Sequence, residues 1–321
     1  MAGSFHRRAL VRFLALGLVL PAAAQEAPRI SFGHVLADFN GALRMGQARV
    51  AIDRATGEAL VAEGRDVRVF NDVGMQVFGF RTSPRLGAVL DLTATPEGDI
   101  ITLAVDLEAP GDQPRVAITV HDFRGVPGAE IQIAGMPPGL AGFLPNRVFF
   151  SLDRLWFAST TGWLVVVAHP DGTFERALDI AAIIGIPPAD RDQQEITGLS
   201  VDEAGRILLT CSVQFRAFEI SSEGALLGSW GDAGSDPGMF AIVAGIARDP
   251  DGRIYVADKN RGVVMVFDAG YRFLMEFGGD PGEGGVLGLP SDVFVGQGKA
   301  YVTQIGRRGV WTYDIGQSPK T

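Results

Sequence analysis

The sequence predicts an all-β protein made of six repeats of a four-stranded antiparallel sheet. Three observations predict it. A glycine turn recurs at a nearly fixed interval, short alternating or apolar runs flank each turn, and no apolar helical period extends beyond residues 179–186. The turns are marked by Gly57, Gly98, Gly205, Gly252 and Gly298. Their spacings are 41, 107, 47 and 46 residues, so one more repeat lies inside the long interval.

That missing repeat fits RVFFSLDRLWFASTTGWLVVVAHPDGTF, residues 147–174, in which Leu152-Asp153-Arg154 replaces the glycine turn. The clearest repeat shows the pattern of each unit, with successive strands VAGIARD, RIYVAD, GVVMVFDA and YRFLMEFG. Four-stranded sheets that recur at this spacing are typical of a β-propeller, in which the sheets stand radially around a channel. The sequence therefore predicts a six-bladed β-propeller over residues 30–316, with 25–29 as a short N-terminal segment and 317–321 as a tail.

The two ends of this region predict how the ring closes. The sixth repeat stops after its third strand, RGVWTYDIG (308–316). The missing fourth strand is present at the other end as ISFGHVLADFNG (30–41), which resembles YRFLMEFGG of the fifth repeat. We expect the N-terminal strand to pair with the C-terminal blade, because this leaves neither end as an open sheet edge.

The fourth to sixth repeats resemble a known family. The stretch GIARDPDGRIYVADKNRGVVMVFD (245–268) is similar to the NHL repeat, whose members form six-bladed propellers. The similarity is strong over 195–315 and looser over the rest. It departs from the usual pattern where Arg261 and Val263 stand in place of the Asn and Arg that follow the VAD aspartate. The resemblance implies the fold, and it does not carry over the activity of any one relative.

The first 24 residues predict export. A basic stretch with Arg7, Arg8 and Arg12 precedes the apolar run FLALGLVL and then AAA, which is the layout of a signal peptide cleaved after Ala24. The apolar run is shorter than the ~20 residues that a membrane span needs. We therefore expect a periplasmic or secreted protein with no stable membrane span after cleavage.

Charge and cysteine content argue against a nucleic-acid-binding protein and exclude a fold held by internal disulfides. Residues 1–24 contain three arginines and no acid, so their removal takes the net charge from −9 to −12. A chain this acidic, with no basic stripe, is not expected to bind nucleic acid. Cys211 is the only cysteine, so no internal disulfide can form, and its strand context predicts a buried, inert thiol.

Two positions that align across the repeats supply candidate binding residues. At one aligned position of the innermost strands, Arg49, Asp91, Arg147 and Asp292 would face the channel mouth beside two glycines, Gly198 and Gly245. Such a ring could hold a polar ligand by charge-assisted bonds, or the charges could pair with one another and plug the channel. At the end of the second strand, a loop-face set is expected to offer surface contacts: Glu63, Asp258, Lys259 and Arg261.

Enzymatic residues are sparse in the sequence. Some related six-bladed propellers are lactonases or lyases, yet none of the three histidines after residue 24 falls on an innermost strand, which argues against a histidine-ligated zinc site. An oxygen-ligated Ca²⁺ held by Asp91 and Asp292 stays possible, with Arg49 and Arg147 opposing it. We therefore expect no catalytic residue, no cofactor, and a module that binds an unknown protein or peptide on its loop-rich face. The alternative is a metal-dependent lactonase- or lyase-like enzyme.

Overall fold

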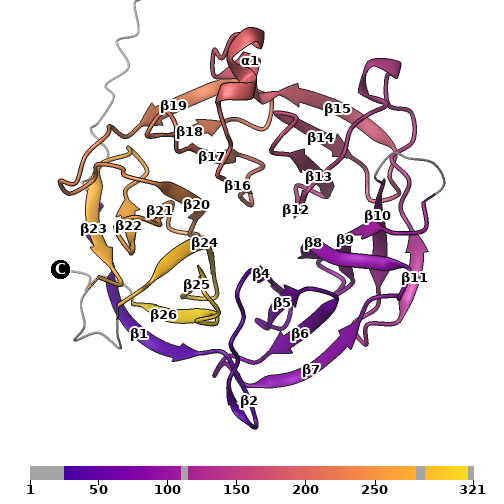
Figure 1. The fold of residues 1–321 in the computed structure, drawn as a ribbon, viewed down its shortest axis with the longest axis horizontal. Helices are drawn as coiled ribbons and strands as arrows, with labels where there is room; N and C mark the ends of the chain where they lie inside the picture. The colour runs from indigo at the N-terminus through magenta and orange to yellow at the C-terminus, as the bar shows by residue number, and fades with distance from the viewer. Residues whose placement is uncertain (1–24, 110–114, 280–285, 317–321) are drawn as a thin grey trace, which may run out of the picture.

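The computed structural model describes residues 25–109, 115–279 and 286–316, which form a closed ring of six blades (Figure 1). Each blade is a four-stranded antiparallel sheet whose first strand lies innermost. The predicted all-β, six-bladed propeller is confirmed. The predicted signal peptide, residues 1–24, and the tail, 317–321, lie outside the described residues.

The strands follow one another from the channel outward in each of the first five blades. Blades one and two consist of β4 (Arg49–Ile52), β5 (Ala59–Glu63), β6 (Asp66–Phe70) and β7 (Gln76–Arg81), then β8 (Leu86–Ala94), β9 (Ile100–Asp106), β10 (Arg115–His121) and β11 (Pro127–Glu130). Blades three and four consist of β12 (Arg147–Ser151), β13 (Arg154–Ser159), β14 (Leu164–Ala168) and β15 (Phe174–Asp179), then β16 (Gly198–Val201), β17 (Ile207–Cys211), β18 (Arg216–Ile220) and β19 (Leu226–Trp230). Blade five consists of β20 (Val243–Arg248), β21 (Ile254–Asp258), β22 (Val263–Phe267) and β23 (Phe273–Phe277).

The sixth blade closes the ring. It combines β24 (Leu289–Gly296), β25 (Lys299–Ile305) and β26 (Trp311–Gly316) with β1 (Arg29–Val35) from the other end of the chain. Phe32 lies opposite Tyr313, and the hydroxyl of Thr312 accepts from the His34 N–H and donates to the His34 carbonyl, each at 3.0 Å. The predicted closure is therefore confirmed.

The N-terminal strand is shorter than the sequence suggests. Strand β1 ends at Val35, and the rest of the expected strand folds into a small hairpin of β2 (Ala37–Asp38) and β3 (Gly41–Ala42). This hairpin protrudes from the ring in Figure 1. Asp38 explains the turn, because its side-chain carboxylate accepts the N–H of Asn40 and so bends the chain.

The antiparallel meander gives the ring two different faces. The turns between first and second strands and between third and fourth strands lie on one face, which we call the turn face. The connections between second and third strands, and those between blades, lie on the other, which we call the loop face. Without a glycine, the third blade turns through Leu152 and Asp153, at φ 52° and 55°, between the paired residues Ser151 and Arg154. This is the left-handed geometry of a two-residue hairpin turn.

The hydrophobic core lies between neighbouring blades. Buried clusters join each blade to the next, so the fold is stabilised by a ring of interfaces and no single core exists. The second strands supply the largest side chains, including Trp156, Tyr255 and Tyr301, all at most 2% exposed. Burial of large side chains at every interface between blades stabilises the ring, in which Cys211 is the only cysteine.

The few helical segments lie in connections. They are the single-turn α1 (Ile180–Ile183) and the 3-10 turns η1 (Pro138–Leu140) and η2 (Pro188–Gln193). Asp179 caps α1 through the N–H of Ala182 at 3.0 Å. In the described part of the chain, no helix is long and apolar enough to cross a membrane.

Candidate functional site: two mouths of one channel

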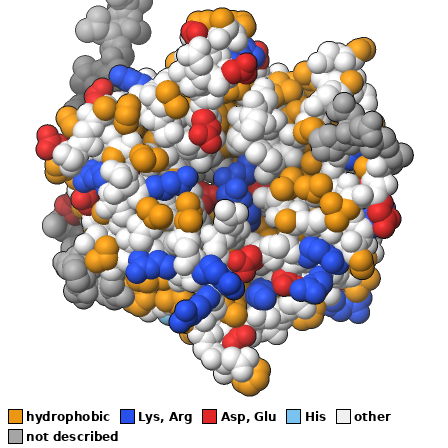
Figure 2. All heavy atoms as spheres, in the orientation of Figure 1, with side chains coloured by type: hydrophobic (Ala, Val, Ile, Leu, Met, Phe, Trp, Pro, Cys, Tyr) orange, Lys and Arg blue, Asp and Glu red, His pale blue; other side chains and the backbone are white. Residues whose placement is uncertain are grey.

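The innermost strands bring four predicted residues together at the loop-face end of the channel. Asp292 of β24 accepts from two guanidinium groups: Arg49 Nη1 lies 2.8 Å and Arg147 Nη2 2.9 Å from the same Oδ2. Arg147 and Asp292 are almost fully buried, at 5% and 4% exposure. One carboxylate therefore joins three blades across the channel. Figure 2 shows basic side chains at the centre of the ring.

The fourth member, Asp91 of β8, faces the same cluster but is held differently. Its Oδ2 accepts the backbone N–H of Val148 at 2.9 Å, and the side chain is 3% exposed. Burial raises the pKa of Asp91, against the opposing effect of Arg147 and Arg49. Burial lowers the pKa of Arg147, but Asp292 and Asp91 outweigh it and raise the pKa overall. Asp292 thus pairs with both arginines, a group that we call the plug, whereas Asp91 lies in their field and is held by the backbone of Val148.

The two aligned glycines allow close contact between blades. A Cβ on Gly198 would lie 2.1 Å from the carbonyl oxygen of Ala244. One on Gly245 would lie 2.0 Å from Asp292 Oδ1 and 2.5 Å from its Cα. The space beside the charged residues is therefore taken by the backbone of the neighbouring innermost strand.

Residues at the second aligned position hold the loop face in place. Glu63 Oε1 accepts the N–H of Gly46 at 2.7 Å, and Gln304 Oε1 accepts that of Gly288 at 2.8 Å. Asp258, fully buried, accepts four backbone N–H groups, those of Ala241, Ile242, Asn260 and Arg261. Each carboxylate or amide thus ties the second strand to the segment that enters its own blade.

The two basic residues predicted beside Asp258 differ in their surroundings. Arg261 is anchored, because it donates to Glu276 at 2.7 Å and to the Met239 carbonyl at 3.0 Å. Lys259 is partly exposed and forms no ion pair within the described ranges. Of this predicted pair, Lys259 is the residue whose charge is available at the surface.

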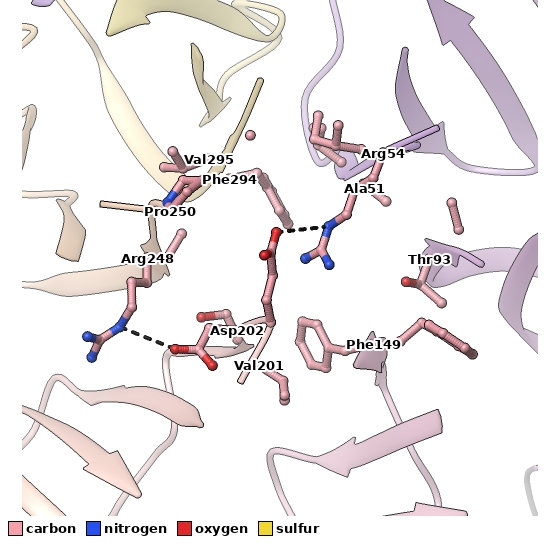
Figure 3. Close-up of a pocket in the computed structure, with 18 of the residues that line it drawn as sticks. Ala51, Arg54, Thr93, Phe149, Val201, Asp202, Arg248, Pro250, Phe294 and Val295 are labelled. Atoms are coloured by element: carbon pink, nitrogen blue, oxygen red, sulfur yellow. Dashed lines mark ion pairs between the residues drawn. The ribbon is translucent and has the colours of Figure 1, made fainter. Parts of the chain in front are cut away.

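The turn-face end of the channel opens into a cavity of about 950 Å³, which the sequence reasoning missed. Its walls are the ends of all six innermost strands and several of their turns, as Figure 3 shows. An ion pair of 3.4 Å between Arg54 and Glu203 crosses from the first blade to the fourth at this end. The repeated aspartate of the DPDG-type turns was the available signal, because Asp202 and Asp249 line this cavity.

A buried charge network stiffens one wall of the cavity. Arg248 of β20 contacts Asp202 at 3.3 Å and also Glu219, and Arg206 lies 2.8 Å from Asp202. Tyr271 donates to Glu219 at 3.0 Å. Two arginines and two carboxylates thus balance between the fourth and fifth blades, where lone buried charges would be costly.

The three histidines of the described residues and Cys211 stand apart from both mouths. His34 lies on β1, His121 on β10 and His169 in a turn between third and fourth strands, as expected from the sequence. Within residues 25–109, 115–279 and 286–316, no three His, Cys, Asp or Glu side chains are grouped to hold a metal. Cys211 is fully buried, and burial raises its pKa to about 12.

Comparison with known proteins shows the fold and no family. No family model matches the sequence, and no curated protein matches it either. Solved structures do resemble it. A protein of unknown function from Bacteroides thetaiotaomicron has a TM-score of 0.61 at 13% identity, covering 91% of this chain and 76% of that one.

Two of the similar structures are named enzymes. Virginiamycin B lyase from Staphylococcus aureus gives a TM-score of 0.56 at 9% identity, covering 90% of this chain and 99% of that one. A gluconolactonase from Xanthomonas campestris gives 0.54 at 16% identity, covering 90% of each chain. At these identities the likeness extends to the fold alone.

Proposed function

We propose that the protein is an exported propeller of the NHL type that binds a protein or peptide partner on its loop face. The observation that carries the proposal is a set of four exposed apolar side chains on the loop face of blades five and six, which we call the apolar patch: Ile242, Val286, Leu289 and Ile305, each 38–49% exposed. Leu289 and Ile305 are paired across β24 and β25. Exposed apolar side chains that gather on one face are typical of protein-binding sites.

Basic side chains border this patch. The Lys259 N–H donates to the Ile242 carbonyl at 2.8 Å, and Arg308 Nη1 donates to the Val286 carbonyl at 2.9 Å, so both residues stand directly beside apolar members. Arg307 is exposed next to Arg308. We therefore expect the partner segment to combine apolar side chains with Asp or Glu, although the protein as a whole is acidic.

The channel supports binding on this face better than catalysis. At the loop-face end, Asp292 already accepts from Arg49 and Arg147, and Asp91 lies in the field of the same arginines. An oxygen-ligated cation between Asp91 and Asp292 would have to displace these ion pairs. The metal-dependent lactonase or lyase alternative therefore gains less support from the geometry than the binding module.

Selection of displayed peptides on the purified protein tests the proposal. We expect the selected peptides to carry apolar residues beside Asp or Glu, and their affinity to fall as salt screens the basic border. The double variant Leu289→Glu/Ile305→Glu should weaken binding at least tenfold. Leu226→Glu is the control, because Leu226 is equally exposed at 46% but lies on the outer strand β19.

Two results would contradict the proposal. One is a failure to select any peptide that the double variant binds less well. The other is an equal loss of binding in the Leu226→Glu control, which would show that the apolar patch has no special role.

A further inference from the structure

The cavity at the turn face has the dimensions of a small-molecule site. Its volume of about 950 Å³ is at the upper end of the ~300–1,000 Å³ that ligand pockets occupy. It lies on the opposite side of the ion-paired plug from the loop face, because its lining begins at residues that follow Arg49, Arg147 and Asp292 along their strands. It is therefore separate from the partner-binding surface.

The wall of the cavity is largely apolar and aromatic. Phe149 from the third blade and Phe294 from the sixth lie on opposite sides of it in Figure 3, and Val201 of the fourth blade also lines it. Val50 of the first blade and Leu92 of the second belong to the same lining. Opposed aromatic rings on rigid strands suit a flat ring system, which would stack or make edge contacts with them. The strands hold these side chains in fixed positions, so little order is lost on binding.

One polar group lies at the inner end of this wall. Asp91 lines the cavity and is 3% exposed, and its hydrogen bond to the described residues is the one from Val148 N. The arginines of the lining differ, because each has a carboxylate partner: Arg54 has Glu203, Arg206 has Asp202, and Arg248 has Asp202 and Glu219. Asp91 thus offers a buried acceptor at the inner end of the cavity, and the lining also contains the hydroxyls of Thr93, Thr95 and Ser200 and the side-chain amide of Gln297.

We propose that this cavity binds a small aromatic molecule that carries an N–H or O–H group, with its ring between Phe149 and Phe294 and its donor on Asp91. The Arg54–Glu203 pair spans the open end and must separate for the molecule to enter. Both side chains are more than half exposed, so the pair is weak enough to open readily. The activity is small-molecule binding, independent of any partner on the loop face.

A matched pair of probes tests the site on the full chain. N-phenyl-1-naphthylamine has two aromatic groups joined by an N–H and fluoresces in apolar surroundings, whereas 1-phenylnaphthalene lacks the N–H. We expect saturable binding of one amine per chain. We expect 1-phenylnaphthalene to compete about tenfold or more weakly, since a hydrogen bond to a carboxylate contributes roughly 1.5–3 kcal/mol.

Two variants locate the probe. Val201→Trp should project an indole into the cavity, obstruct the binding position and lower the affinity at least tenfold, whereas Val73→Trp, at a site 61% exposed outside the lining, should not. Asp91→Asn should reduce the preference for the amine to a few-fold. Far-ultraviolet circular dichroism and the melting temperature check that each variant folds.

The outcome also separates this site from the loop face. The double variant Leu289→Glu/Ile305→Glu should bind the amine as the parent does, even if it loses peptide binding. Any of three results would overturn the proposal: no saturable binding of the amine, equal affinities for the two probes, or undiminished binding by a folded Val201→Trp variant.

Discussion

The two ends of the channel are built from the same six strands but reach opposite results. At the loop-face end, the charged side chains of Arg49 and Arg147 converge on Asp292 and pair with it across the channel. At the turn face, apolar residues such as Val50 and Val201 line the wall and leave about 950 Å³ open. The repeat fixes the backbone around the channel. The side chains at each end, and whether they pair with one another, then decide how much of the channel stays open.

The largest expected effect comes from removing the shared carboxylate of the closed end. Asp292→Asn leaves the buried Arg147 and its neighbour Arg49 without their common counter-charge, and should lower the free energy of unfolding by about 3–5 kcal/mol. Urea denaturation measures this. Asp232→Asn is the control, because that carboxylate is 78% exposed and should change stability by less than about 0.5 kcal/mol. Similar effects for both variants would mean that the plug does not stabilise the ring.

The close contact between Gly245 of β20 and Asp292 of β24 gives the second-largest expected effect on stability. Gly245→Ala places a methyl group within 2.5 Å of the Asp292 backbone and should lower the free energy of unfolding by about 1–3 kcal/mol. Gly142→Ala serves as the matched control, since a Cβ there meets nothing within 4 Å. Thermal melting of the two variants compares them. An unchanged Gly245→Ala protein would contradict the packing of β20 on β24.

Asp91 lies between the ion pairs of the loop-face end and the cavity of the turn-face end, and it should make the stability of the protein depend on pH. Because burial raises its pKa in the fold, its stabilising contribution is full below the unfolded pKa and is lost as pH rises through the folded pKa. The parent should therefore gain stability relative to Asp91→Asn when pH falls from 7 towards 4. Urea midpoints of both proteins at the two pH values measure the difference. If the parent protein instead loses stability relative to Asp91→Asn at the lower pH, the fold favours the charged form of the Asp91 carboxylate.

The smallest effect on stability belongs to the open end. Arg54→Ala removes the exposed pair with Glu203 and should change the free energy of unfolding by less than about 0.5 kcal/mol. The same variant should increase the association rate of N-phenyl-1-naphthylamine several-fold in stopped-flow fluorescence, because the pair no longer spans the opening. A slower rate would show that Arg54 attracts the probe and does not obstruct it.

The fold was predictable because its determinants are local and repeated. Turn glycines, strand length and alternation recur in each unit, and the leftover strand at 30–41 pointed to the closing partner of 308–316. The ring of Arg49, Asp91, Arg147 and Asp292 could be aligned for the same reason, since equivalent positions of a propeller meet at one level.

The cavity and the apolar patch were harder to foresee. The cavity involves contacts between blades that have no fixed sequence spacing, such as Arg54 with Glu203 or Arg248 with Glu219, and the patch depends on which apolar side chains stay exposed. Residue type alone also does not show pairing: Arg261 was predicted as a surface contact, and its guanidinium pairs with Glu276. Only coordinates show which charges remain available.

The pairing of β1 with β26 has a consequence for how the chain assembles. Ile30 and Ile315 are partners, so the final seam joins residues separated by nearly the whole described length of the chain. The entropic cost of closing a loop rises by only about 0.6 kcal/mol for each doubling of its length. Contacts between segments this far apart in the sequence nevertheless slow folding. Until β26 has been synthesised, Phe32 and its neighbours on β1 therefore have no strand to pair with. We expect the propeller to reach its full stability only when β26 has joined β1.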